Sequence, residues 1–391
     1  MAKQVVFGAA NIALACSFLV LPALPAKATD CANGQILLGE ICVETEEAAS
    51  TIGRMVEDSK DRFDLTAAIV SVEVGGTPVL TEAFGTSMAG IPARPEMHFR
   101  NGAVAIAYLA SVLLRLQEDG VLSLDDHLSQ WFPDYPRADD VTLAMLINST
   151  SGYADYVNLD LLPLYEDPFR QFQPEELIEI GLSQPMACDP GTCFNYAHTN
   201  IVILGEVLSA ASGRSVEDLI DDYVLAPLAL ENTRSESTPV IQQPVLHAFT
   251  AERGVLEDST YWNPSWTLAE GSIMTTDIGD LLTSAIAIGS GSLLAPDSYS
   301  EMVAPTTAGL APFSNQTYYA LGVLVTNDWV VQTPSFAGYA AVMAYLPSEQ
   351  IGIAVAVTSG AETPDSPRPA NTIFSEIGAY LAPETAPGIG R

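Results

Sequence analysis

Segments with the composition of β-strands lie near both ends of this chain, and the segment between them is helical. Residues 66–74 and 77–84 are rich in β-branched residues, and the Gly75-Gly76 pair between them is typical of a tight hairpin. Further strand patterns cover residues 320–325, 329–332, 338–346 and 351–358. Strands from both ends can share one sheet when the middle packs against it. The pattern therefore predicts an α/β (α+β) fold, with an antiparallel sheet flanked by helices plus a helical domain.

The helical patterns and the loops between them predict how the chain is divided. The sequence pattern predicts helices over residues 46–63, 104–117, 199–211 and 371–381, and residues 123–126 should cap a short helix that ends near Pro133. We expect, in order, a signal peptide (1–28), an N-terminal extension with a disulfide (29–59), a main domain (60–382) and a tail (383–391). The helical part of the main domain should cover about residues 120–270.

Residues 1–28 have the composition of a secretory signal peptide. Lys3 supplies a positive charge, residues 5–24 are largely apolar, and Ala26-Lys27-Ala28 has the small-x-small form of a cleavage site. An uncleaved membrane anchor is the alternative, although glycine, asparagine and proline interrupt the apolar run. No later stretch approaches the roughly 18 apolar residues of a membrane-spanning helix. The sequence therefore predicts a periplasmic or secreted protein with no membrane span after cleavage.

The cysteines predict two short-range disulfides. Cys31 and Cys42 flank a segment with Asn33-Gly34 turn chemistry, and Cys188 and Cys193 flank the turn Asp-Pro-Gly-Thr. In an exported chain this spacing favours two local disulfides. A metal site is the alternative, but the chain has no C-x-x-C pair and no H-x-x-x-H, and its 4 histidines lie far apart in sequence. We therefore expect no metal and no cofactor.

The charge of the chain restricts its partners. There are 48 acidic and 15 basic residues, which gives a formal net charge of −33. Loss of residues 1–28 removes two lysines and no acid, so 13 basic residues and a net charge of −35 remain. Nucleic acid and anionic lipid are excluded as default partners, because phosphate binding requires clustered Lys and Arg. The acidic surface either keeps the protein soluble in salty surroundings or serves as a patch for a cationic partner.

Four segments follow one another in the order and spacing of a known family. They are Phe99–Ile106, Leu116–Asp126, Leu146–Tyr153 and Pro190–Tyr196. In that order they resemble the serine β-lactamase family, and most closely its class C-like group of β-lactamases, D-alanyl-D-alanine carboxypeptidases and esterases. Residues 341–347 also fit, and the resemblance covers about residues 60–382. It implies the fold of that family, a sheet domain plus a helical domain, and serine hydrolase chemistry.

The resemblance also implies three catalytic motifs, and the first of them is altered in this chain. The family keeps S-x-x-K at the start of a buried helix, where the lysine helps to remove the proton of the nucleophilic serine. Counted from Phe99-Arg100, the serine position falls on Ala103 and the lysine position on Ile106. A shifted register does not restore the motif, because Lys60 is the only lysine after residue 28 and Glu57 stands three residues before it.

The other two motifs are altered as well. The family's Y-x-N corresponds to Tyr196-Ala197-His198, which keeps the tyrosine and replaces the asparagine. The family's K-T-G or H-x-G triplet helps to bind a substrate carboxylate, and it falls near Gln332-Thr333-Pro334, where no cation remains. Changes at all three motifs predict a catalytically inactive member. Its cleft would bind a small molecule or an envelope partner through Tyr196, His198, Gln332 and Thr333.

Two other functions stay open. One is a divergent esterase, peptidase or amidase that uses another nucleophile, with Tyr196 or His198 as the base. The candidate nucleophiles are Ser149, Ser151 and Ser335. The other is a structural envelope protein recognised through its acidic surface. Four tryptophans are candidates either for stacking on a ligand or for packing in the core, namely Trp131, Trp262, Trp266 and Trp329.

Overall fold

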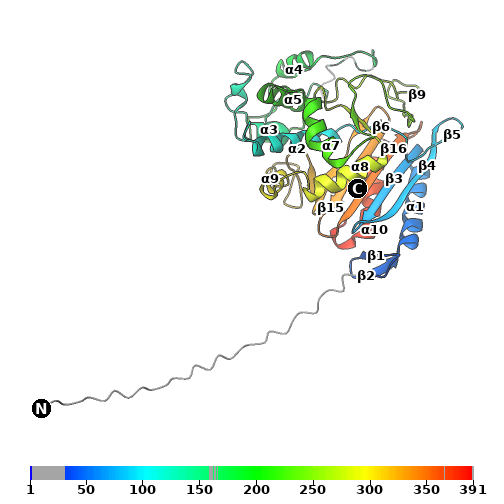
Figure 1. The fold of residues 1–391 in the computed structure, drawn as a ribbon. Coiled ribbons are helices and arrows are strands. Elements are labelled where there is room, and N and C mark those ends of the chain that lie inside the picture. Colours follow the sequence, from blue (N-terminus) through cyan, green and yellow to red (C-terminus); the bar gives the residue numbers. More distant parts are fainter. Residues whose placement is uncertain (2–30, 158–161, 163, 165, 365, 390–391) are drawn as a thin grey trace.

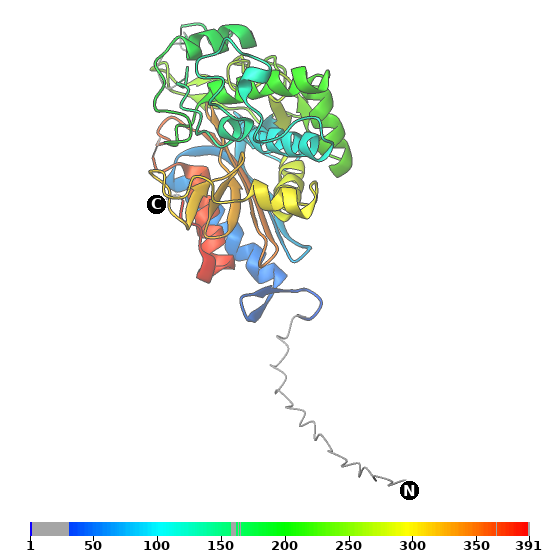
Figure 2. The same cartoon turned by 90° about the vertical axis from the view of Figure 1, so that its left-hand side faces the viewer.

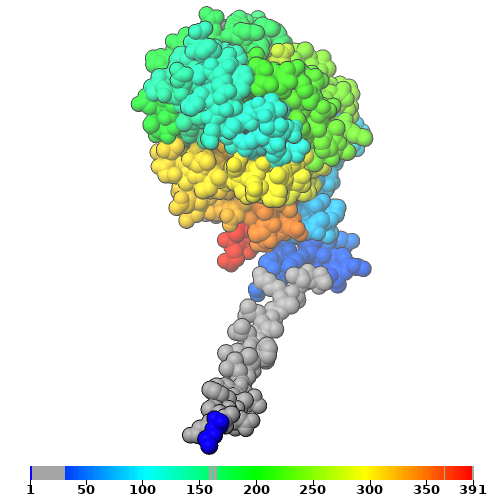
Figure 3. Space-filling view, turned by 60° about the vertical axis from the view of Figure 1, so that its left-hand side comes forward, coloured from blue at the N-terminus to red at the C-terminus, as the bar shows by residue number. Residues whose placement is uncertain are grey.

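The computed structural model describes Met1 and residues 31–157, 162, 164, 166–364 and 366–389. The predicted signal peptide therefore lies outside the described residues. The helices and strands form two layers, which Figures 1 and 2 show from perpendicular directions. Both ends of the described chain contribute to the sheet layer, and the middle forms the helical layer. In Figure 3 the middle of the chain, in cyan and green, covers one half of the molecule, and the blue, orange and red segments lie in the other half.

The described residues form a nine-stranded antiparallel sheet. Its strands lie in the order β11 (Thr317–Tyr319), β12 (Leu324–Thr326), β13 (Trp329–Gln332), β15 (Tyr339–Leu346), β16 (Ile351–Ser359), β3 (Leu65–Val74), β4 (Thr77–Met88) and β5 (Ile91–Pro92), and β14 (Ser335–Phe336) pairs with β15. Near its centre β16 pairs with β3, which joins the two ends of the chain. The predicted antiparallel sheet is therefore confirmed.

The central strands separate two apolar cores. Successive side chains of a strand point to opposite faces of the sheet. In β16 the side chains of Ile353, Val355 and Val357 pack into one core. Those of Ala354 and Ala356 pack into the other core. Strand β16 therefore turns large aliphatic side chains to one face of the sheet and small ones to the other.

Helices cover both of these faces. Helices α1 (Thr45–Arg62) and α10 (Pro369–Leu381) pack on the face with the larger side chains. Helix α8 (Ile278–Ser290) packs on the alanine face. Its approach is so close that a Cβ on Gly352 of β16 would lie 2.9 Å from Ile286 Cγ1. The small residues of β16 thus make room for α8, which separates the sheet from the helical layer.

The helical layer is built around α2 (Val104–Glu118), which is buried over most of its length. The other helices are α3 (Leu143–Ile147), α4 (Pro174–Leu182), α5 (His198–Ser212), α6 (Val216–Ile220), α7 (Ala226–Leu228) and α9 (Pro296–Met302), with shorter turns at Leu128–Gln130, Asp221–Leu225 and Pro383–Thr385. Small sheets are formed by β1 (Gln35–Leu38) with β2 (Ile41–Glu44), by β6 (Phe99–Arg100), β10 (Met274–Thr276) and β7 (Arg234–Ser235), and by β8 (Phe249–Thr250) with β9 (Glu257–Asp258). Within the described part of the chain, no helix has the length and apolar character needed to cross a membrane.

Both predicted disulfides are present. Cys31 is bonded to Cys42 across the β1–β2 hairpin, and Cys188 is bonded to Cys193 across a short turn. The predicted strand over residues 320–325 is confirmed at Leu324 and Val325, which belong to β12, and is wrong over residues 320–323. Gly322 has a φ of +70°, and the residues on either side of this turn belong to β11 and β12, which pair as a hairpin.

The short helix predicted before Pro133 is a single 3₁₀ turn, Leu128–Gln130. In the segment before it, the carboxylate of Asp126 accepts the backbone N–H of Ser123 at 2.8 Å, and the hydroxyl of Ser123 accepts the N–H of Asp125 at 3.3 Å. Such side-chain bonds to the local backbone are typical of caps and turns.

Candidate functional site

A cavity of about 1280 Å³ lies where the helical layer meets the end of the sheet layer. Of the positions in the three altered motifs, Ala103, Tyr196, His198, Gln332, Thr333 and Pro334 line it. Ile106 is not among the lining residues and is fully buried. The cavity therefore brings together segments that lie more than 200 residues apart in the chain.

The start of α2 forms one wall of the cavity. Strand β6 leads into this helix, and Ala103 is its first capping residue and lies half-buried at the cavity surface. Ile106 has 0% exposure and belongs to the apolar core of the helical layer. Its backbone oxygen would lie 2.8 Å from a Cβ on Gly322. The first turn of α2 thus presents a methyl group to the cavity and turns an aliphatic side chain into the core.

Tyr196 lies half-buried on the cavity wall, directly before α5. Its ring meets the ring of His198 edge-on, with centroids 5.4 Å apart. Burial raises the pKa of the Tyr196 hydroxyl well above its ordinary value; Tyr319 and Asp155 add to this rise and Arg368 opposes it. The hydroxyl therefore stays protonated at neutral pH, which disfavours Tyr196 as a base.

His198, the first residue of α5, is paired with Asp155, whose role the sequence did not reveal. Its ring Nδ1 lies 3.1 Å and 3.2 Å from the two carboxylate oxygens of Asp155. The same carboxylate accepts the backbone N–H of His198 at 3.2 Å and that of Val157 at 3.1 Å. Asp155 is 4% exposed. A buried carboxylate therefore caps α5 and fixes the orientation of the His198 imidazole.

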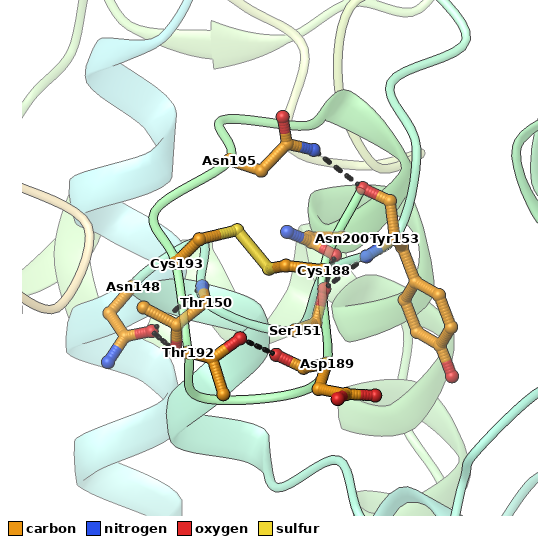
Figure 4. The surroundings of a disulfide bond; sticks show 10 residues. All are labelled: Asn148, Thr150, Ser151, Tyr153, Cys188, Asp189, Thr192, Cys193, Asn195 and Asn200. Atoms are coloured by element: carbon orange, nitrogen blue, oxygen red, sulfur yellow. Dashed lines mark hydrogen bonds between the residues drawn. A yellow bond between two sulfur atoms is a disulfide. The ribbon is translucent and has the colours of Figure 1, made fainter. Parts of the chain in front are cut away.

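The disulfide Cys188–Cys193 and the turn around it hold this part of the cavity in place (Figure 4). After the disulfide, the side-chain amide of Asn195 donates to the Tyr153 carbonyl at 2.8 Å. The turn at Gly152 packs against the disulfide loop so closely that a Cβ there would lie 2.2 Å from the Cys188 carbonyl oxygen. The segment carrying Asp155 and the segment carrying His198 are thereby fixed against each other.

The end of β13 forms the opposite wall. Gln332 is buried, and its amide donates hydrogen bonds to the Gly322 carbonyl and, at 3.4 Å, to the Tyr319 hydroxyl. Burial raises the pKa of Tyr319 to about 12, and the bond from Gln332 opposes this rise. Pro334 packs against the start of α2, since a Cβ on Gly102 would lie 2.7 Å from Pro334 Cβ. The amide of Gln332 is thus engaged within the protein, and Thr333 is the half-buried residue of this triplet.

The candidate nucleophiles differ in access to the cavity. Ser149 and Ser151 are buried and lie outside the lining, and the Ser151 hydroxyl donates to Asn200 Oδ1 at 2.6 Å. Ser335 is exposed and lines the cavity, but no hydrogen bond joins it to His198 or Tyr196. No serine in the described part of the chain is therefore hydrogen-bonded to the imidazole of His198.

Aromatic side chains contribute to the cavity lining, together with aliphatic, polar and charged ones. Trp262 and Trp266 line it, whereas Trp131 and Trp329 do not, and Trp329 is fully buried in the core of the sheet. The lining also includes Phe172, Phe194, Phe313, Tyr319, Phe336 and Tyr339. In the described ranges no group of three or more His, Cys, Asp or Glu side chains is placed to hold a metal ion.

Arg100 also reaches the cavity, but its guanidinium is engaged by the protein. It donates to the backbone carbonyls of Glu236 at 3.0 Å, Thr238 at 2.7 Å and Val240 at 3.2 Å. Burial lowers the pKa of Arg100 to about 10. Arg100 therefore fixes the segment 236–240 against β6 through carbonyl groups.

A sequence model described as Beta-lactamase matches residues 53–375. This chain belongs to the β-lactamase family. Penicillin-binding protein 4 of Amycolatopsis lactamdurans is 26% identical over 170 residues, which are 42% of this chain and 43% of that protein. An esterase of Burkholderia gladioli is 28% identical over 157 residues, or 37% and 40% of the two chains. These matches span about two fifths of the length of the curated relatives.

Solved structures of the family share the fold. A D-stereospecific amidohydrolase from Streptomyces aligns with a TM-score of 0.71 at 21% identity, over 81% of this chain and 96% of that one. An octameric penicillin-binding protein homologue from Pyrococcus abyssi aligns with a TM-score of 0.72 at 20% identity, over 86% and 79% of the two chains. At this level of identity the likeness establishes the fold alone.

Proposed function

We propose that this chain is an exported, catalytically silent member of the β-lactamase family that binds a small molecule in its cavity. The observation that carries the proposal is the pair Ala103 and Ile106. They stand where the family motif has its nucleophilic serine and its lysine, and one is a methyl group at the cavity surface while the other is buried in the core. A serine hydrolase that loses its nucleophile loses roughly 10⁶-fold in turnover.

Two further observations support the loss of catalysis rather than a mechanism that uses other residues. The tyrosine that the family uses in proton transfer, here Tyr196, has a pKa raised by burial and so remains protonated. The triplet at Gln332 has no cation, and its amide is bonded to Gly322 and Tyr319. A large cavity with several aromatic side chains in its lining is retained beside these altered positions, which favours binding as its use.

Intact-protein mass spectrometry tests this proposal. The chain isolated from an exporting host is incubated with a fluorophosphonate and, separately, with a penicillin, beside a relative that retains S-x-x-K. We expect the relative to gain one adduct and this chain to gain none. A stoichiometric adduct on one serine of the folded protein contradicts the proposal. The same spectrum tests export, because the mass should correspond to a chain that begins at residue 29.

The Asp155–His198 pair favours one alternative, a divergent hydrolase with His198 as the base. A carboxylate that orients an imidazole is the arrangement that activates a nucleophile or a water molecule. This alternative predicts turnover of an activated ester that is lost in His198→Ala and kept in His247→Ala. The second histidine is a matched control, because it is also paired with a carboxylate but lies outside the cavity lining. Turnover equal to the uncatalysed rate excludes the alternative.

A further inference from the structure

The carboxylate of Asp155 determines which ring nitrogen of His198 carries the proton. A carboxylate accepts hydrogen bonds and does not donate them. Its other partners in the described chain are backbone N–H groups of Val157 and His198, at 3.1 Å and 3.2 Å. The nitrogen that faces it, Nδ1, must therefore be the donor. In a neutral imidazole the remaining nitrogen, Nε2, is then an acceptor with a free lone pair.

This acceptor is available to a ligand. His198 lines the cavity, and 19% of its side chain is exposed. Nε2 lies on the side of the ring opposite the pair formed with Asp155. No hydrogen bond joins Nε2 to any described residue, and it is not among the buried polar atoms that lack a partner. The only polar function that His198 can offer to a bound molecule is therefore this lone pair.

Aromatic rings surround the imidazole. The ring centroid of His198 lies 6.0 Å from that of Tyr156, 5.4 Å from that of Tyr196 and 6.3 Å from that of Trp266. The aromatic wall continues from Trp266 to Phe336 at 5.8 Å. Tyr196, Trp266 and Phe336 line the cavity, whereas Tyr156 is fully buried, so a planar ring can stack on the three lining rings or meet them edge-on.

We propose that the cavity binds a planar ring ligand that donates an N–H or O–H hydrogen bond to Nε2 of His198. Asp155 is the positioning residue for this preference, because it fixes the proton on Nδ1. The inference rests on the proposed function, since it names the ligand class of the same cavity. The replacement of the family's asparagine by histidine thus changes the recognition chemistry of this wall from an amide to a ring acceptor.

Two probes of the same shape test the donor preference. Indole carries a ring N–H, and benzofuran has an oxygen in its place and no donor. We measure binding of each to the full chain by calorimetry at alkaline pH, where the imidazole of model peptides is neutral. One hydrogen bond corresponds to roughly a three- to tenfold difference in affinity, so indole should bind tighter by that factor.

The variant Asp155→Asn should abolish the preference. An asparagine amide keeps one oxygen for the backbone N–H groups of Val157 and His198 and places an NH₂ donor toward Nδ1. The proton of the imidazole then moves to Nε2, which no longer accepts from indole. The matched control is Asp258→Asn, since Asp258 lies 2.8 Å from Nδ1 of His247 and neither residue lines the cavity. This control should keep the preference for indole.

Nitrogen-15 NMR of the histidine rings gives a readout that needs no ligand. The His198 signal, assigned by its loss in His198→Gln, should show a protonated Nδ1 and an unprotonated Nε2 in the natural chain. In Asp155→Asn the proton should be on Nε2, and Nδ1 should be unprotonated. If Asp155 had only a structural role, its substitution would leave the proton on Nδ1. A protonated Nε2 in the natural chain overturns the inference, and this result stands even if the variant does not fold.

The binding results for indole and benzofuran also test the proposed ligand class. Equal affinity for indole and benzofuran, or a preference that persists in Asp155→Asn, overturns the donor selection. Binding of neither ring overturns the ligand class. None of these results bears on catalytic silence, which the labelling experiment with fluorophosphonate and penicillin tests separately. The two proposals can therefore fail independently.

Discussion

Ile106 occupies a site in which a lysine would have no water and no partner of opposite charge in the apolar core. We expect Ile106→Lys to lower the free energy of unfolding by about 3–5 kcal/mol, because an uncompensated buried charge costs that much. Ile106→Met keeps the volume and should cost less than about 1.5 kcal/mol. Denaturant unfolding of the two variants measures the difference. A lysine variant as stable as the methionine variant would show that the site admits a cation.

The sequence predicted part of the candidate site at the level of single residues. Motif spacing selected Tyr196, His198, Gln332 and Thr333, and all of them lie along one cavity. Their role in binding stays a prediction. Asp155 was missed because it lies 43 residues before His198 and has no motif around it. In a chain with 48 acidic residues, one carboxylate carries no signal until the fold places it beside the imidazole.

Among the elements, the contact of α4 with α5 sets the position of His198. Gly181 of α4 lies where a Cβ would come within 2.4 Å of Thr199 Oγ1 and 3.0 Å of Thr199 Cβ. Thr199 is fully buried and its hydroxyl donates to the Ala154 carbonyl at 2.6 Å, one residue from Asp155. We expect Gly181→Ala to destabilise the protein by about 1–3 kcal/mol, although alanine is the better helix former.

Gly279 of α8 is the matched control for this substitution. It is exposed, and a Cβ there would meet only Asp277 Oδ1 at 3.5 Å, an ordinary contact. Gly279→Ala should therefore be neutral or stabilise by up to about 1 kcal/mol. Thermal unfolding of both variants tests the pair. If both glycines respond alike, close packing of α4 on α5 does not decide the effect.

The elements themselves were predicted where periodicity is strong. The hairpin of β3 and β4, helix α2 and strands β13, β15 and β16 lie within a few residues of the expected ranges. The prediction failed over residues 320–323, where Leu321 and Val323 flank Gly322 and give an apolar run that resembles a strand. The chain turns there because Gly322 adopts a φ of +70° and lies against the backbone of α2. That contact is between distant segments, so local sequence could not indicate it.

For the whole molecule, charge repulsion should govern stability at low ionic strength. The formal net charge of −33 disfavours the compact state, and added salt screens this repulsion. We expect the Tm to rise by a few degrees between about 10 mM and 150 mM sodium chloride at pH 7. Near pH 4 about half of the carboxylates are protonated, so the salt effect should shrink. A Tm that is independent of salt at pH 7 contradicts this expectation.

The pairing of β16 with β3 determines how late in synthesis the sheet can fold. Thr66 and Thr358 lie 292 residues apart and are joined by a 2.7 Å hydrogen bond between their hydroxyls. A ribosome releases β3 and β4 early, and the edge that β16 will cover stays open until almost the entire chain has been synthesised. Folding through such distant contacts is slow. If the chain is exported unfolded, the same delay means that the sheet can close only when translocation is nearly finished.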